Sequence, residues 1–597
     1  MALVAVPLGW IMIGRRVLHT FNQLRKLLPG GQQDFAWIRA HGLIYVDKTR
    51  YLYQLATINQ PLLLTRPRRF GKSTLVSTLE ELFLHGVAPY DGHDSLFKGL
   101  DIEPLWPQDP DNEGPFYVLH LDFWDLIKDC NSVAAFKQCL NEQILHFATE
   151  SQLELKTISS AGLDVFKLLL DAVPDGSVVL LVDEYDAPLT HFLGSTDSAT
   201  SEDMAQVLRG FFANVKVRAQ KFRFTFITGI TRLKDTSIFT AGNTIADISQ
   251  DPEFGAICGV TREEIQRYFP EHLRYASSQW LQVPLEQVCA QHVEQLLNEM
   301  TEWYDGYCFD SHGATHVFCL WSILCFFREK WTDFDTFWFD SGGLPEILRK
   351  CLFNSSWPER LNLLAGESVQ VSRDAFLNPS TLATMQPEVL LFQTGYLTLK
   401  TPYRGAAAPD KSSMLLGIPN KEMEDALSRL YCVDFLANTQ GFKIGFIAKL
   451  RTAIDTHDET ALQKCFNELL QGVDYEHYPL TQESGVTNTL YIGVSLALHI
   501  RVIVNHHEAK GRADLLFVWQ QTTVVIEFKY AHKLTDCDNL LQQAVAQVLD
   551  RNYGDTFAQR QHLWRLAMVF CAESREISAV QTVSLQSFPC AGGPPAG

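Results

Sequence analysis

Two groups of residues in this chain have the types and spacing that chemistry requires. The first is the stretch "RPRRFGKST" at 66–74, which ends like the phosphate-binding pattern G-x-x-x-x-G-K-[ST] but has Arg66 where that pattern has glycine. The second is "GRADLLFVWQQTTVVIEFKYA" at 511–531, which combines Asp514, Glu527 and Lys529. The first group indicates phosphate binding, and the second indicates metal-supported chemistry on a phosphodiester.

The second half of the phosphate-binding pattern is intact. The first amide groups of a helix have no intrahelical partner, so a helix that begins near Gly71 can hold an anion. We expect Lys72 to reach the β and γ phosphates and the Ser73 hydroxyl to bind Mg²⁺, with Thr74 next in the loop. An ordinary basic turn before a helix is the alternative interpretation.

The arginines of the loop add positive charge beside a bound triphosphate, at Arg66, Arg68 and Arg69. If position 66 needs a left-handed backbone, its missing glycine costs about 1–2 kcal/mol. Each charge-assisted hydrogen bond to phosphate contributes about 1.5–3 kcal/mol. Several such bonds outweigh one strained residue, so we expect the loop to bind a nucleotide.

The stretch "VVLLVDEYD" at 178–186 supplies the acidic partner of such a loop. A carboxylate at the end of a buried strand holds Mg²⁺ in P-loop ATPases, which predicts that role for Asp183. The adjacent Glu184 is expected to orient or activate the attacking water. A solvated strand end is the structural alternative. Further along, Thr228, Thr231 and Arg232 are weaker candidates for sensing the γ phosphate.

The second group of residues lies on a predicted hairpin. Glu527 and Lys529 are two residues apart on one strand and so face the same side. A tight turn at Gln520 and Gln521 places Asp514 opposite Glu527, which brings two carboxylates and a lysine together as a metal-dependent nuclease needs. A turn one residue longer would face Asp514 away, and an exposed strand with alternating charges is the alternative.

The elements that must position these residues follow from the apolar pattern. Strand-like runs at 61–65, 116–123, 177–186 and 221–230 alternate with helical patterns, and a run such as 178–182, apolar throughout, suits a parallel sheet covered on both faces. We therefore predict an α/β fold, a P-loop parallel sheet, with a helical accessory region and a C-terminal α/β restriction-endonuclease-like domain. Thr261 and Glu264 form a capping-box pattern that opens the helical region.

The predicted domain boundaries follow these changes of pattern. We expect an N-terminal extension at 1–26, a P-loop domain at 27–250, a helical accessory region and linker at 251–473, a nuclease-like domain at 474–585 and a flexible tail at 586–597. The apolar N-terminus lacks the leading charges of a secretory signal, and no run is long enough to span a membrane.

Composition limits the classes of protein that fit. The chain has 597 residues, 46% of them hydrophobic, so it can bury several cores. Its formal charge of −19 argues against a surface that coats nucleic acid nonspecifically. The 13 cysteines show neither a disulfide framework nor zinc-ligand spacing, which favours a reducing, cytoplasmic location.

The motifs together resemble a known family. "LTRPRRFGKSTLVSTL", "LLVDEYDAPL" and "FITGITRLKDTSIFTAGNTIADIS" look like the AAA-ATPase-like family that carries a C-terminal PD-(D/E)XK nuclease-like domain. In that family Arg-Pro-Arg-Arg-Phe-Gly-Lys-Ser is the usual form of the loop, so the resemblance explains Arg66. "WYDGYCF" and "LGIPNKEMEDAL" extend the resemblance through the middle of the chain.

The resemblance also identifies departures and further site residues. Cys319 and Leu320 stand where the family usually shows Asn-Pro, which affects local packing more than chemistry. In the first helix of the nuclease-like domain, Asn488 replaces a glutamate and Ile492 a histidine, and the lost carboxylate would weaken metal binding. The resemblance also places three residues near the nuclease-like site: Glu508, Gln547 and Tyr553.

Two functional hypotheses remain. In the first, an ATP-binding and ATP-hydrolysing P-loop module with Mg²⁺ controls a nuclease-like domain that acts on DNA or RNA, in a protein that could form a homo-oligomer. In the second, the chain is a nucleotide-dependent switch whose nuclease fold is an inert interaction module. The retained Asp514, Glu527 and Lys529 favour the first hypothesis, and Asn488 and Ile492 favour the second.

Overall fold

The computed structural model describes the chain in stretches, and everything below refers to them. They are residues 26–90, 92–107, 116–155, 165–192, 198–232, 245–329, 334–340, 368–379, 385–402, 404, 412–427, 440–473, 480–498, 500, 502–508, 511–551 and 562–584. Residues 1–25 of the predicted N-terminal extension, the predicted C-terminal tail and Tyr553 fall outside these stretches. The chain divides into two compact units. The first contains Met1–Leu352 and Val369–Met423, and the second contains Phe353–Ser368 and Glu424–Gly597.

The first unit is organised around a five-stranded sheet in the order β2-β3-β4-β1-β5, whose neighbouring strands all pair in parallel. The predicted strands are confirmed and slightly shorter than their apolar runs. The strands are β1 (Leu62–Thr65), β2 (Tyr117–Asp122), β3 (Val178–Asp183), β4 (Phe222–Gly229) and β5 (Ala246–Asp247). Every residue of β3 is buried, as expected for a strand with helices on both faces.

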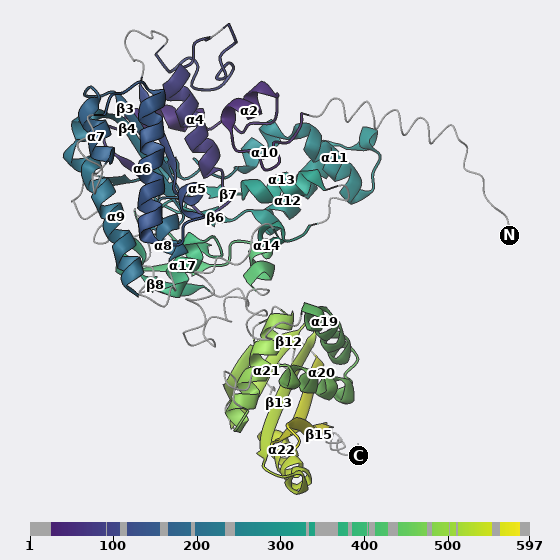
Figure 1. Ribbon diagram of the computed structural model, residues 1–597. Coiled ribbons are helices and arrows are strands. Elements are labelled where there is room, and N and C mark those ends of the chain that lie inside the picture. The colour runs from purple at the N-terminus through teal and green to yellow at the C-terminus, as the bar shows by residue number, and fades with distance from the viewer. Residues whose placement is uncertain are drawn as a thin grey trace, which may run out of the picture. The chain divides into compact units, whose positions relative to one another are not determined.

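Helices cover this sheet, and Figure 1 shows the long helices α6 and α9 in front of it. Helix α4 contacts β2, β3 and β4 directly. The helices of this layer are α2 (Phe35–Ala40), α3 (Thr49–Ala56), α4 (Lys72–His85), α5 (Phe123–Ile127), α6 (Val133–Glu150), α7 (Val165–Ala172), α8 (Ala187–His191) and α9 (Ser198–Val217). The predicted α/β architecture of this unit is therefore confirmed.

A helical subdomain follows β5 and packs around a core of its own. It contains α10 (Arg262–Tyr268), α11 (Pro270–Leu281), α12 (Ala290–Tyr304), α13 (Leu320–Arg328) and α14 (Phe337–Asp340). Thr261 caps α10 through the predicted capping box with Glu264. The core joins side chains from α10 to α13, among them Ile265, Phe269, Leu296, Tyr304 and Phe326.

Short strands and helices complete the first unit. A three-stranded sheet has the order β8-β10-β9, and β6 pairs with β7. These elements are β6 (Tyr307–Cys308), β7 (His316–Val317), β8 (Val369–Ser372), α16 (Arg373–Leu377), α17 (Pro387–Gln393), β9 (Thr398–Leu399) and β10 (Ser413–Gly417).

The second unit has a mixed five-stranded sheet in the order β11-β12-β13-β14-β15, in which only the β13–β14 pair is parallel. Its strands are β11 (Val502–Glu508), β12 (Gly511–Trp519), β13 (Thr522–Ala531), β14 (His562–Cys571) and β15 (Glu576–Thr582). Its helices are α19 (Gln440–Asp455), α20 (Glu459–Gln471), α21 (Glu483–Leu498) and α22 (Cys537–Arg551). The predicted C-terminal α/β fold is confirmed.

The second unit begins earlier than the domain boundary predicted at residue 474. Helix α20 packs on β15, where Gln463 Nε2 and Asn467 Nδ2 donate to the carbonyl of Ile577 at 2.7 and 3.1 Å. Because these side chains belong to a region of helical pattern, the sequence alone gave no sign that they pack with the strands that follow. None of the helices in the described stretches combines the length and apolar composition needed to cross a bilayer.

Gly306 shows how closely the segment that ends the first unit is packed. Its φ is +91°, and an added Cβ would lie 2.5 Å from the carbonyl oxygen of Pro419. Next to it, Asn420 Nδ2 donates to the carbonyl of Asp305 at 2.6 Å. The motif at 303–309 therefore accommodates the chain at 419–420 only because position 306 has no side chain.

We expect Gly306→Ala to destabilise the first unit, by about 1–2 kcal/mol from the left-handed backbone alone and further from the contact with Pro419. Chemical denaturation of the full chain measures the effect. Gly210→Ala, in α9 where an added Cβ meets nothing within 4 Å, is the matched control and should stabilise the unit by about 0.5–1 kcal/mol. Equal unfolding midpoints for the two variants would contradict this account.

Candidate functional site

The loop between β1 and α4 turns sharply before the helix begins. Gly71, the N-cap of α4, has a left-handed backbone with φ 93°, and no side chain caps the helix. The amide groups of the first turn are therefore not occupied by a capping side chain, which is the condition for binding an anion. Lys72 is buried, and its Nζ donates to the carbonyl of Pro67 at 3.0 Å. The helix start and its lysine thus face the loop as predicted for a phosphate-binding loop.

Arg66 differs from the sequence expectation. Its guanidinium is buried and donates to the carbonyls of Thr65, Ser249 and Phe254 at 2.9, 2.6 and 3.0 Å. It also lies 4.7 Å from the centroid of the Phe309 ring, and burial lowers the pKa of Arg66 to about 10. Arg66 therefore ties the loop to neighbouring segments instead of adding charge beside a triphosphate.

The backbone strain expected at position 66 is found elsewhere in the loop. The residues of the loop with positive φ are Arg69, at 71°, and Gly71. Arg69 donates through Nη1 to the carbonyl of Trp338, and its guanidinium lies 5.4 Å from the centroid of that indole. Arg69 is thus also directed into the protein. Of the three loop arginines, Arg68 has the freest guanidinium, 5.8 Å from the ring of Trp124.

The acidic partner lies two strands away in the same sheet. Asp183 ends β3 and is buried, and β4 separates β3 from the loop strand β1. The parallel strands place their carboxyl ends along one edge of the sheet, so Asp183 and the loop lie on the same edge. Asp183 Oδ1 accepts from the amide of Glu184 at 2.9 Å, a bond that turns the carboxylate toward the backbone of the next residue.

Glu184 has an unusual backbone and an unusual acidity. Its φ is 48°, a left-handed conformation that costs a non-glycine residue about 1–2 kcal/mol. Burial raises the pKa of Glu184 to about 7, although Lys72 and Arg68 favour its charged form. The influence of these two cations of the loop indicates that the Glu184 carboxylate lies near the loop.

Asp122 is a further carboxylate at this edge that sequence reasoning missed. It ends β2 and pairs in register with Asp183. Its side chain accepts from the amides of Trp124 and Asp125 at 2.9 and 3.2 Å and so caps α5. Burial raises the pKa of Asp122, and the charge of Asp183 adds to the effect. The sequence pattern that could have identified Asp122 is an aspartate at the end of a strand-like apolar run, as at Asp183.

The three predicted phosphate sensors after β4 separate into different roles. Thr231 and Arg232 already have partners within the protein, because Thr231 Oγ1 donates to Asp186 and Arg232 Nε pairs with Asp247. Thr228 is completely buried, and its Oγ1 has no hydrogen-bond partner in the described part of the chain. Since Thr228 lies on the strand between the loop strand and β3, it is the best placed of the three to meet a ligand.

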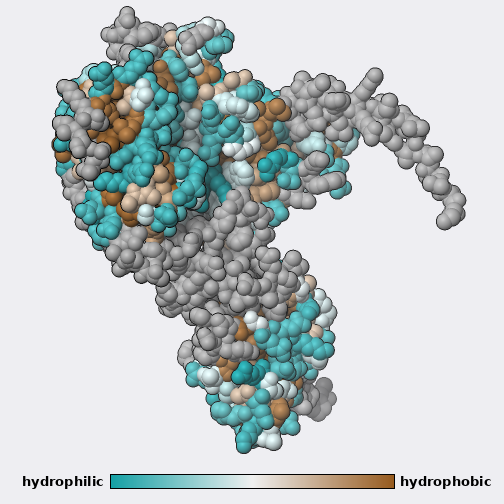
Figure 2. Space-filling view, in the orientation of Figure 1, coloured by the Kyte–Doolittle hydropathy of each residue, from teal (hydrophilic) through white to brown (hydrophobic). Residues whose placement is uncertain are grey.

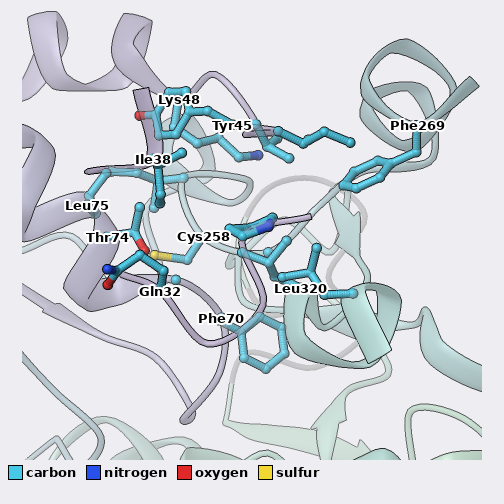
Figure 3. Close-up of a pocket in the computed structure, with 17 residues that line it drawn as sticks. Gln32, Ile38, Tyr45, Lys48, Phe70, Thr74, Leu75, Cys258, Phe269 and Leu320 are labelled. Carbon is cyan, nitrogen blue, oxygen red and sulfur yellow. The ribbon is translucent and has the colours of Figure 1, made fainter. Parts of the chain in front are cut away.

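A largely apolar pocket adjoins the loop and the start of α4. Figure 3 shows Phe70, Thr74 and Leu320 among its lining residues. Leu320 lies where the chain departs from the family pattern, and its Cδ2 would be 3.4 Å from a Cβ at position 71. The N-terminal segment contributes Gln32, Ile38, Tyr45 and Lys48, and the helical subdomain contributes Cys258 and Phe269.

The second unit contains the predicted hairpin in the predicted register. Trp519 pairs with Thr522, so the turn is Gln520-Gln521, and Leu515 pairs with Ile526. The regular pairing of the two strands ends at this pair. Beyond it, the amide of Phe528 donates to Asp514 Oδ2 at 2.8 Å. Gln520, in this turn, has a left-handed backbone with a φ of 51°.

The acidic residues of this hairpin come together around Glu527. Glu527 is 1% exposed; its Oε1 accepts from Lys529 Nζ at 2.8 Å, and its Oε2 has no partner among the described residues. Burial and the charge of Asp514 raise the pKa of Glu527 to about 7. Burial lowers the pKa of Lys529, but the bond to Glu527 outweighs this effect and the net shift is upward.

Glu483, the first residue of α21, is a carboxylate near this cluster that the sequence interpretation did not single out. Its charge raises the pKa of both Glu527 and Lys529. The hydroxyl of Tyr530 donates to the carbonyl of Leu480 at 3.2 Å, which fixes the start of α21 beside β13. No spacing relates Glu483 to the hairpin, so only the folded chain reveals it.

The structure describes some of the other residues that were expected near this site. Ile492 is buried in α21, and Gln547 lies on α22, which contacts β13 and β14. The side chains of Asn488 and Glu508 lie outside what the structure describes, as does Tyr553. Among the described residues no group of three or more histidine, cysteine or acidic side chains is arranged to hold a metal.

Comparisons with known families agree with both halves of this geometry. Residues 29–239 match the family model described as predicted AAA-ATPase, and residues 481–580 match that of the PD-(D/E)XK nuclease superfamily. The chain thus carries an AAA-ATPase-like domain and, at its C-terminal end, a domain of the PD-(D/E)XK nuclease superfamily.

One relative is similar to this chain over nearly the whole length of both sequences. An uncharacterized protein in the vnfD 5' region of Azotobacter chroococcum mcd 1 is 27% identical over 572 residues, which cover 94% of this chain and 99% of the relative. The similarity therefore extends through the region between the two matched domains.

The placement of Arg66 generates a prediction about stability. Arg66→Ala removes three charge-assisted bonds to buried carbonyls and should lower the free energy of unfolding of the first unit by about 2–5 kcal/mol. Arg68→Ala, in the same loop, should change stability by less than about 0.5 kcal/mol. Denaturation of both variants measures the difference, and an Arg66→Ala variant as stable as Arg68→Ala would refute the structural role of Arg66.

Proposed function

We propose that the first unit binds and hydrolyses Mg·ATP and thereby controls a C-terminal nuclease-like domain that acts on nucleic acid. The observation that carries this proposal is the shared edge of the parallel sheet. On that edge the uncapped start of α4 with Lys72 lies on the same side as Asp183, which is buried, and Glu184, which is half-buried. Both halves of a phosphoryl-transfer site are then present in one rigid sheet.

The residues of the first unit fit a nucleotide with its magnesium ion. The bond from Lys72 to the carbonyl of Pro67 is one that a phosphate oxygen can replace, and the amides at the start of α4 add donors. Ser73 and Asp183 would hold Mg²⁺, which neutralises charge on the phosphates. The apolar pocket beside Gly71 and Thr74 suits the base of the nucleotide.

Within this site Glu184 is assigned to the water. Its side chain is half-buried, the positive charges of Lys72 and Arg68 favour its ionised form, and its pKa of about 7 matches the requirement for a group that accepts a proton near neutral pH. Thr228 contributes a buried hydroxyl without a partner in the described chain on the strand between the two motifs. These residues orient a water and hold its proton while the loop holds the phosphates.

For the nuclease-like domain, Asp514 and Glu527 would hold a divalent cation and Lys529 would supply positive charge. The unpartnered Oε2 of Glu527, beside Asp514, is the observation that supports a cation there. The metal would polarise the scissile phosphate and its water. The fit is limited to these two carboxylates within the described residues.

The alternative is a nucleotide-dependent switch with an inert nuclease fold. It is favoured by Asn488, which stands where the resemblance implies a glutamate, and by the bond from the amide of Phe528 that Asp514 Oδ2 already accepts. From Asp474 onward the chain has 9 Lys and Arg against 12 Asp and Glu, so positive residues that would bind nucleic acid are not in excess. Figure 2 shows that the visible face of the molecule is mostly hydrophilic. A cleavage assay distinguishes the two hypotheses.

Lys72→Ala should weaken the binding of Mg·ATP by at least about 10- to 100-fold, because each charge-assisted bond to phosphate contributes about 1.5–3 kcal/mol. Isothermal titration calorimetry measures the affinity. Lys98→Ala, whose amine pairs with Asp94 on the surface, is the control and should bind like the wild type. Equal affinity of Lys72→Ala and wild type would exclude the loop as the nucleotide site.

Glu184→Gln should bind ATP with nearly unchanged affinity and hydrolyse it about 100-fold more slowly or worse, because a positioned general base contributes about 10²–10⁴-fold. Asp183→Ala should in addition lose the dependence of binding on Mg²⁺. Steady-state hydrolysis and calorimetry separate these effects. Indistinguishable turnover by wild type and Glu184→Gln would remove Glu184 from the reaction.

If the nuclease-like site is active, cleavage should require Mg²⁺ or Mn²⁺ and be lost in Asp514→Asn and Lys529→Ala, while ATP hydrolysis continues. Asparagine retains an oxygen for the amide of Phe528, so the hairpin keeps its fold. Asp536→Asn, on the exposed turn before α22, is the control. Absence of cleavage of single- and double-stranded DNA and RNA by wild type would favour the inert hypothesis, and Asn488→Glu then tests whether one carboxylate is missing.

A further inference from the structure

The carboxylate of Asp186 binds the chain that follows β4. It is 2% exposed, and its Oδ1 accepts from the amide of Ile230 at 3.1 Å. Its Oδ2 accepts from the amide and the hydroxyl of Thr231 at 2.7 and 2.5 Å. Three hydrogen bonds from one buried carboxylate thus hold two consecutive residues. The negative charge of Asp186 also contributes to the raised pKa of Glu184.

Tyr185 adds two bonds to the same segment. Its amide donates to the carbonyl of Thr228 at 3.0 Å, and its hydroxyl donates to the carbonyl of Thr231 at 2.8 Å. The side chain is completely buried. Both ends of the segment 228–231 are therefore tied to the two residues that directly follow Glu184.

Gly229 gives this arrangement the space it requires. An added Cβ at position 229 would lie 2.4 Å from Asp186 Oδ1 and 2.6 Å from Cδ1 of the Tyr185 ring. The carbonyl of Gly229 accepts from the amide of Arg66 at 3.1 Å, and Gly229 pairs with Thr65 at the end of β1. The contacts at this point join the carboxyl ends of β3, β4 and β1.

We propose that Tyr185 and Asp186 form a positioning clamp, which holds the segment 228–231 against the turn at Glu184 and so sets the geometry for ATP hydrolysis. This inference rests on the proposed function of the first unit. Every bond of Asp186 described above goes to protein, so Asp186 is a positioning residue and not a catalytic one. Its action is transmitted through the placement of Glu184 and Thr228.

The turn at Glu184 explains why a clamp is needed. The left-handed backbone of Glu184 is unfavourable for glutamate and persists only when its surroundings hold it. Its own bonds are local, because its amide donates to Asp183 and its carbonyl accepts from Ala187 at 2.9 Å. The bonds of Tyr185 and Asp186 are the nonlocal ones. A general base acts only within hydrogen-bond reach, and a displacement of about 1 Å can cost about 100-fold in rate.

The test uses the full chain and changes the partner of Asp186 with the smallest possible disturbance. Thr231→Val keeps the shape of the side chain and removes only the hydroxyl donor, whereas Thr231→Ser keeps the donor and is the matched control. We expect Thr231→Val to lower kcat about tenfold, the effect of losing one bond to a charged acceptor, with KM for Mg·ATP within about twofold. Thr231→Ser should hydrolyse like the wild type.

A second pair of variants extends the test to the clamp itself. Tyr185→Phe removes the bond to the carbonyl of Thr231, and Asp186→Asn weakens all three bonds of the carboxylate. Both should lower kcat more than they raise KM, and nucleotide affinity measured by calorimetry should remain close to that of wild type. If Asp186→Asn does not fold, the Thr231 pair still decides the question.

The outcomes separate this inference from the function on which it rests. Wild-type protein that binds ATP without hydrolysing it would refute the proposed hydrolysis and the clamp's role in it. Active wild type with an equally active Thr231→Val would overturn the clamp alone. Equal losses in Thr231→Val and Thr231→Ser, or a fall in affinity and melting temperature that accounts for the lost rate, would show a purely structural contact and overturn the inference as well.

Discussion

The parallel pairing of β1, β4 and β3 is the constraint on which the site of the first unit depends. Parallel strands end on the same edge of a sheet, so residues that follow them meet although the sequence separates them widely. Lys72 follows β1, Thr228 lies near the end of β4, and Asp183 ends β3. A helix start, a hydroxyl and a carboxylate are thereby aligned by backbone hydrogen bonds alone, before any side chain contributes.

Two arginines of the loop stabilise its conformation through their charged side chains. Arg66 and Arg69 both direct their guanidinium groups into the protein, toward carbonyls of segments far along the chain. A guanidinium satisfies several acceptors in fixed directions, so a glycine-poor loop can be held rigid from behind. Two of the arginines therefore hold the shape of the loop, and the proposed binding of phosphate falls to the helix start and Lys72.

Sequence reasoning predicted much of the local structure and little of the long-range contacts. The apolar runs identified the strands, and the structure contains the tight turn at Gln520 and Gln521 that placed Asp514 opposite Glu527 in the sequence interpretation. The burial of Arg66 could not be foreseen, because its acceptors at 249 and 254 come from a segment whose position depends on the finished sheet. Glu483 was missed for the same reason, since a helix start has no fixed spacing from a hairpin.

The two-residue turn between β12 and β13 also limits how this domain can change in length. Side chains alternate between the two faces of a strand, so one residue added or lost at Gln520-Gln521 would move Asp514 to the other face while Glu527 and Lys529 stayed in place. Most surface loops accept insertions at small cost. Here a length change that leaves the sheet almost as stable would separate the two carboxylates, so homologues with this arrangement should keep the length of the turn even where its residues differ.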